Sequence, residues 1–163
     1  MGSLVTSFGQ WLEHSSLAYA MDNTAYVFTV VSVLHYFSIF VTVGTSVVVD
    51  LGLLGAAGRR HRAAALAGQL LPWMWVALVL AALTGFLMFA PDAPTFFRIG
   101  FFSWKLLGMA FSIGAVALIH CNVRKWDEAP TLPPAAKAAA VVSILLWIVT
   151  LVMALEIAQF ANI

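Results

Sequence analysis

Residues 24–54 read TAYVFTVVSVLHYFSIFVTVGTSVVVDLGLL, a long apolar run that only a few polar side chains interrupt. A helix needs about 20 apolar residues to cross the hydrocarbon core of a bilayer, which is roughly 30 Å thick. This run is longer, so a helix over it has room to tilt or to project from the membrane. Further runs of the same character cover about residues 64–90, 96–122 and 135–161. The sequence therefore predicts four transmembrane helices.

The composition of the whole chain agrees with this interpretation. Of its 163 residues, 63% are hydrophobic and 9% are charged, whereas soluble domains average about 45–50% apolar and about 25% charged residues. A net charge of +1 argues against a nucleic-acid partner held by global charge. The single cysteine, Cys121, excludes an intrachain disulfide framework. These figures predict an integral membrane protein whose first partner is the lipid bilayer.

The first 23 residues differ from the rest of the chain. Residues 7–22 mix polar and apolar side chains and are too few to span a bilayer, so they predict a helix lying at the membrane surface. Residues 24–163 form one domain, and Pro72 is expected to kink the second span. The predicted fold class is all-α, an integral membrane four-helix bundle preceded by a short interfacial helix.

Orientation follows from the basic residues that lie in or near the short connections. Arg98 alone falls on one side of the predicted bundle. We therefore expect both chain termini to face away from the cytoplasm. The basic residues on the opposite, cytoplasmic side are Arg59, Arg60, Arg62, Arg124, Lys125 and Lys137.

Ionisable residues at bilayer depth are costly, and each is a functional hypothesis by default. At about 1.5 Å per residue, His35, Lys105 and Glu156 fall within roughly two helical turns of one another, on the outer side. Thr84 and Met109 lie at the same depth. Asp50 and His120 instead lie near the cytoplasmic ends of their helices. The two histidines are therefore too far apart to ligate one metal ion.

A buried neutral imidazole is a common metal ligand, and haem b can use a single buried histidine in a helical bundle. We therefore predict His35, Lys105, Glu156 and Met109 as cofactor-binding residues, with His35 and His120 as candidate metal ligands. Lys105 could pair with a haem propionate, act as a second axial amine, or pair with Glu156. The alternative is that His35 only bonds a serine or carbonyl of a neighbouring helix, and that Lys105 snorkels outward. Asp50 is expected to pair with a basic or amide group.

Several short motifs resemble those of known membrane proteins. They are His35-Tyr-Phe-Ser, Thr42-Val-Gly44-Thr, Asp50-Leu-Gly-Leu-Leu-Gly, Leu71-Pro72-Trp73, Thr84-Gly85 and Trp104-Lys105-Leu106 followed by His120. Together they resemble a group of uncharacterised bacterial four-helix membrane proteins. The outline is also similar to HemJ-type protoporphyrinogen oxidases and, more loosely, to CopD-type copper-resistance proteins.

The resemblance implies residence in the bacterial inner membrane, with His35 as a haem b ligand and Lys105 essential at the same site. It also matches His120 to a histidine at the end of the third helix. The additional surface helix and the short basic connection look more like the uncharacterised group than like the oxidases. Haem binding is therefore carried over as an expectation, and porphyrinogen oxidation is not.

The leading hypothesis is a haem b protein that transfers electrons, alone or as the membrane subunit of a larger redox complex. A second is an accessory subunit without a cofactor, which packs on other membrane subunits or on a second copy of the chain. A third is a copper-handling protein, in which His120 and Cys121 would form a soft-metal pair. No phosphate loop or nucleophile–base pair indicates other catalysis, and the sequence leaves open whether the protein is an enzyme.

Overall fold

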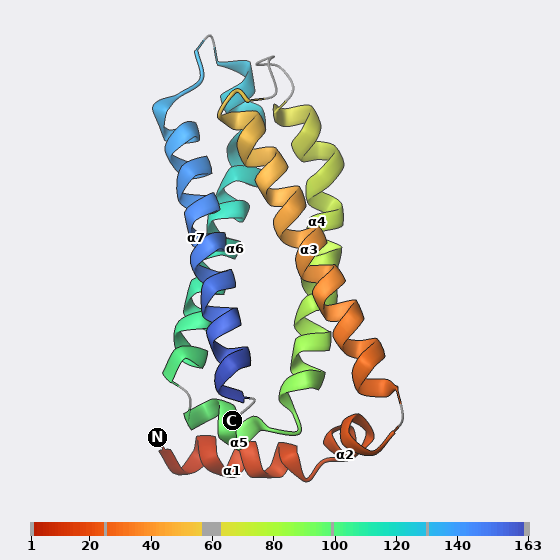
Figure 1. Ribbon diagram of the computed structural model, residues 1–163. Helices are drawn as coiled ribbons and strands as arrows, with labels where there is room; N and C mark the ends of the chain where they lie inside the picture. The colour runs from red at the N-terminus through yellow and green to blue at the C-terminus, as the bar shows by residue number, and fades with distance from the viewer. Residues whose placement is uncertain (1, 25, 57–62, 99, 130, 162–163) are drawn as a thin grey trace.

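The computed structural model describes residues 2–24, 26–56, 63–98, 100–129 and 131–161 (Figure 1). These residues form helices and no strand. Four of the helices are long and apolar enough to cross a membrane: α3 (Val27–Leu53), α4 (Ala63–Phe89), α6 (Gly100–Glu128) and α7 (Pro134–Ala161). The chain is an all-α, multi-pass membrane protein built on a four-helix bundle, as the sequence predicts.

The long helices form two antiparallel hairpins that lie side by side, α3 with α4 and α6 with α7 (Figure 1). Helix α3 also packs on α7, and α4 packs on α6. We call the end where α3 and α6 finish and α4 and α7 begin the hairpin end. We call the opposite end, where α7 finishes and α1 and α5 lie, the terminal end (Figure 1).

The N-terminal residues 2–23, which we call the surface segment, form two helices, so the prediction of one helix over residues 7–22 is wrong. Helix α1 (Gly2–Glu13) and helix α2 (Ser16–Asn23) meet at Ser15, whose hydroxyl accepts a hydrogen bond from the backbone N–H of Ala18 at 3.3 Å. Serine is a favoured N-cap because its side chain replaces a missing intrahelical partner. The cap starts a new helix at this point, so the chain can turn and follow the end of the bundle.

The third span begins later than the predicted residue 96. Residues 93–98 form a short helix of their own, α5 (Ala93–Arg98), and α6 runs from Gly100 to Glu128. Phe96 and Phe97 of α5 pack on Phe89 of α4, at ring-centroid distances of 5.7 and 5.2 Å, and Phe102 of α6 stacks on Phe89 at 5.2 Å. This aromatic contact closes the terminal end, so residues 96–98 do not open the next span. At the other end α6 continues to Glu128, past residue 122, where this span was predicted to end.

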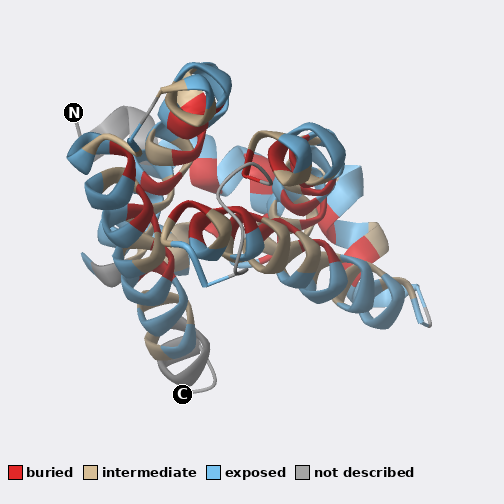
Figure 2. Cartoon of the chain, turned by 90° about the horizontal axis from the view of Figure 1, so that it is seen from above, coloured by how far each residue is buried: buried red, intermediate tan, exposed pale blue. Residues whose placement is uncertain are grey.

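The apolar core lies toward the hairpin end, where all four long helices contribute to it. Figure 2 shows the buried residues on the sides of the helices that face one another. The side chains facing outward include many large hydrophobic residues, as a bilayer-embedded bundle requires. The buried residues of this core are Val49, Leu53, Ala63, Ala67, Leu71, Met74, Val116, Ile119, Val123, Ala136, Ala140 and Trp147.

Toward the terminal end the interior becomes polar and its side chains become small. One hydrogen bond of this region joins Ser112 Oγ of α6 to Thr150 Oγ1 of α7 at 3.3 Å, and it fixes the register of that hairpin. We call this region the polar layer. Its buried residues are Ser38, Thr42, Ala77, Ala81, Thr84, Ser112 and Thr150.

The two hairpins are joined by a buried hydrogen bond, from Trp147 Nε1 on α7 to Ser46 Oγ on α3 at 3.0 Å. Substituting Ser46→Ala should lower the free energy of unfolding by about 1 kcal/mol, because the buried indole N–H loses its acceptor. Ser38→Ala is the matched control, since Ser38 is equally buried and its hydroxyl donates only to Leu34 O of its own helix. Thermal unfolding of both variants in one detergent measures the difference. Equal losses would contradict the role given to the Trp147 bond.

Candidate functional site

The His35 side chain joins α3 to α4 through its Nδ1 atom. Nδ1 lies 3.0 Å from Ala81 O and 3.0 Å from Thr84 Oγ1. A carbonyl oxygen only accepts hydrogen bonds, and the Thr84 hydroxyl already donates to Leu80 O at 2.7 Å. Both neighbours of Nδ1 are therefore acceptors, and Nδ1 carries the hydrogen. In the neutral ring, Nε2 is then left with a free lone pair.

Gly85 provides the space in which this ring lies. A Cβ atom added to Gly85 would stand 2.8 Å from His35 Cε1, closer than real Cβ contacts come. The adjacent Thr84 and Gly85 thus have separate roles, one as hydrogen-bond acceptor and the other as the surface against which the imidazole packs. The sequence singled out this pair of residues, but only the structure shows that both act on His35.

Lys105 of α6 is the charged side chain that interacts with His35 across the bundle. The register of α6 and α7 places Glu156 at a similar depth, because Lys105 and Glu156 lie seven and six residues beyond the bonded pair Ser112 and Thr150. Within the described residues no ion pair joins Lys105 to Glu156. The structure therefore does not contain the pairing of these two residues that the sequence offered as one role for Lys105. Met109 is half-buried, one turn from Lys105 on the same helix.

His120 lies at a different level of the bundle. Trp75 Nε1 donates to His120 Nδ1 at 2.9 Å, and the two rings stack. Because Nδ1 accepts this bond, the neutral ring carries its hydrogen on Nε2 and offers no free lone pair in this arrangement. Trp75 and Thr84 stand nine residues apart on α4, about 14 Å along the axis. The two histidines therefore lie at separate levels, as expected, and His120 as a metal ligand stays a prediction.

The other expected ligands do not gather into a metal cluster. Cys121 is exposed, and the described residues include no group of three or more His, Cys, Asp or Glu side chains that could hold a metal ion. Asp50 is 1% exposed and faces the Ser143 hydroxyl of α7, where the sequence suggested a basic or amide partner. Arg59, Arg60 and Arg62, the basic residues that follow α3, lie outside the described residues, so the expected pairing of Asp50 stays a prediction. A residue can be assigned its depth from sequence, but its partner depends on helix rotation.

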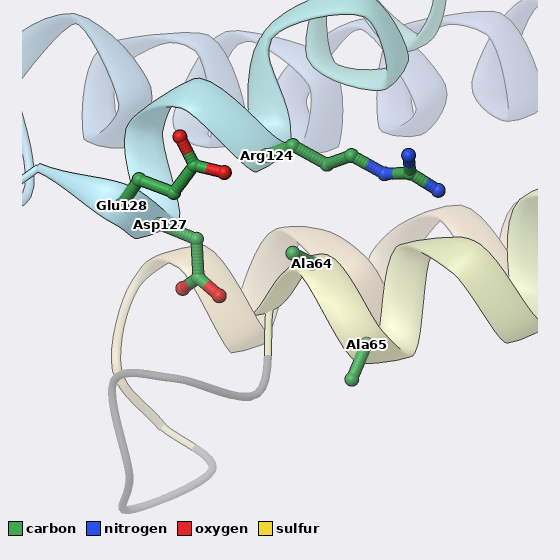
Figure 3. Close-up of a pocket in the computed structure, with 5 residues that line it drawn as sticks. All are labelled: Ala64, Ala65, Arg124, Asp127 and Glu128. Carbon is green, nitrogen blue, oxygen red and sulfur yellow. The ribbon is translucent and has the colours of Figure 1, made fainter.

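An open recess that sequence reasoning did not anticipate lies at the hairpin end. It measures about 460 Å³ and lies between α4 and α6, where Ala64 and Ala65 of α4 and Arg124, Asp127 and Glu128 of α6 line it (Figure 3). An adjoining recess of about 340 Å³ reaches His120. The run of small residues at the start of α4 is the only sequence signal for this space, and such residues are common in membrane helices.

No family model, curated protein or solved structure matches this chain. The functional argument therefore rests on the residues themselves, and the family resemblance remains an expectation.

The packing of the His35 imidazole against Gly85 can be tested with two glycine substitutions. Gly85→Ala should lower the free energy of unfolding by about 1–3 kcal/mol, because its Cβ would displace the imidazole and strain its bonds to α4. Gly44→Ala is the matched control, since a Cβ there meets nothing within 4 Å. The control should be neutral, or stabilising by up to about 1 kcal/mol through helix propensity. Chemical unfolding of both variants in one detergent measures the two changes in the free energy of unfolding. Equal changes would contradict the contact assigned between Gly85 and His35.

Proposed function

We propose that this chain is a haem b-binding integral membrane protein that carries electrons, alone or as the membrane subunit of a larger redox complex. The observation that carries the proposal is the state of His35. Its Nδ1–H is held by two acceptors of α4, and no residue that the structure describes donates a hydrogen bond to its Nε2. Metal-ligating histidines almost always donate their other ring N–H to a carbonyl, carboxylate or water, which fixes the tautomer and orients the ring.

The other side chains at the depth of His35 are also compatible with an iron porphyrin. His35 would hold the iron through Nε2, and the bound haem would supply a one-electron redox couple. Lys105 would attract a propionate, because it brings a positive charge into the same region and has no pairing with Glu156. Met109 and Glu156 would lie beside the group at the same depth. Small inward side chains of the polar layer leave the flat macrocycle fewer bulky groups to displace than the apolar core would.

This chain's own residues would perform three tasks at such a site. Ala81 O and Thr84 Oγ1 orient the imidazole and hold its proton on Nδ1. The surrounding apolar helices exclude water, which strengthens electrostatic interactions inside the bundle. Lys105 favours a ligand that carries negative charge. None of these tasks needs a nucleophile, so electron transfer is favoured over group-transfer chemistry.

The proposed location is the bacterial inner membrane, with the hairpin end toward the cytoplasm. Arg124, Lys125 and Lys137 lie at that end, whereas Arg98 lies on α5 at the terminal end. This distribution supports the orientation through the positive-inside rule, with both termini outside the cytoplasm. Arg59, Arg60 and Arg62, which contribute to the sequence-based expectation, lie outside the described residues.

The proposal predicts a spectrum. Protein purified from haem-replete cells should show a Soret band and, after dithionite reduction, an α-band typical of b-type haem. His35→Ala should abolish both bands, because it removes the proposed ligand. His14→Ala is the matched control, since His14 is exposed in the turn after α1 and its ring bonds only Gln10 O among the described residues.

A spectrum that is unchanged in His35→Ala would overturn the assignment of the ligand. A wild-type protein without either band would overturn the haem proposal itself. In that case the bonds of His35 would serve helix packing, and the accessory-subunit hypothesis would be favoured.

A further inference from the structure

Asp50 is the one fully buried ionisable side chain among the residues described. It is 1% exposed and lies on α3 where that helix meets α7. Its position is three residues from Leu53, the last residue of α3, so the carboxyl group lies about 5 Å along the axis from the hairpin end. The proposed haem site does not use it.

No cation compensates this carboxyl group within the described chain. The interacting side chain is Ser143, which is itself 0% exposed. Neither Asp50 Oδ2 nor Ser143 Oγ has a hydrogen-bond partner of good geometry. Helix α4 contains no charged residue, and α7 contains only Lys137, which is exposed, and the distant Glu156. The ionisable groups of α6 at this end are His120, Cys121, Arg124, Lys125, Asp127 and Glu128, and none of them interacts with Asp50.

An isolated carboxylate in a low-dielectric interior costs far more than a neutral carboxylic acid. A proton on the carboxyl group removes that charge and creates an O–H donor. The adjacent Ser143 Oγ is an acceptor without a partner, so a small rotation of either side chain satisfies both groups. We propose that Asp50 and Ser143 form a proton-binding site within the membrane domain, occupied at neutral pH.

The same face of α3 indicates how the proton reaches this site. Ser46, Thr42 and Ser38 continue from Asp50 at four-residue intervals toward the polar layer. The Thr42 hydroxyl donates to Ser38 O at 2.8 Å, and the Ser38 hydroxyl donates to Leu34 O at 2.6 Å. Because these protons are committed to backbone carbonyls, the row does not pass a proton toward His35. The hairpin end, about 5 Å away along the axis, is the shorter route by which a proton would exchange.

Infrared spectroscopy of the full-length protein in lipid nanodiscs tests the proposal. At neutral pH the wild type should show the C=O stretch of a protonated carboxylic acid, which shifts in heavy water. Asp50→Asn should lose this band while keeping a similar shape and volume. Ser143→Ala should keep the band but move it to higher frequency, because the acid loses its hydrogen-bond acceptor. Asp22→Asn, at an exposed position on α2, is the matched control and should leave the band unchanged.

Two results would overturn the proton site. One is the absence of a carboxylic-acid band at neutral pH, or its persistence in Asp50→Asn. The other is loss of the band on adding sodium chloride at constant pH, with recovery in choline chloride, which would assign the site to a metal cation. Ser143→Ala keeps the acid itself, so it tests the pairing even where Asp50→Asn fails to assemble. None of these readouts depends on haem, so they are independent of the proposed function.

Discussion

The hydrocarbon core of a bilayer offers no water, so a polar group that this bundle buries is costly unless it finds a partner within the protein. Side-chain hydrogen bonds meet this requirement at each of the four contacts between neighbouring long helices. They form a closed circuit around the bundle, which explains why the polar residues of the spans mark the helix interfaces. The bonds are His35 to Ala81 and Thr84 for α3–α4, Trp75 to His120 for α4–α6, Ser112 to Thr150 for α6–α7, and Trp147 to Ser46 for α7–α3.

The interior these bonds enclose is not uniform. At the hairpin end, apolar side chains from all four long helices interlock around the buried pair Asp50 and Ser143. Toward the terminal end, small and hydroxyl-bearing residues replace them, and His35 and Lys105 stand in the same region. Apolar packing thus dominates one end of the bundle, while most of the buried hydroxyl groups and His35 lie toward the other end.

Depth was the quantity that sequence reasoning predicted well. Counting residues from the helix ends separated His35 from His120, and the structure places them at different levels of α4. The neighbours of these side chains were not predicted in the same detail. The carboxyl group of Asp50 faces Ser143, a residue that the sequence did not single out. A rotation of one helix by about 100° exchanges the neighbours of a side chain without changing its depth, and the sequence contains little information about that rotation.

The sequence by itself determined that this chain is a multi-pass, all-α membrane protein, because apolar runs of sufficient length can satisfy their backbone in a bilayer only as helices. It also determined which polar residues those helices carry and how deep they lie. Only the tertiary structure decided that Gly85 makes room for His35, that Thr84 and Ala81 hold its proton on Nδ1, and that Ser15 divides the surface segment into two helices. The reason is physical, since each of these features depends on atoms of different segments coming within a few ångströms of one another.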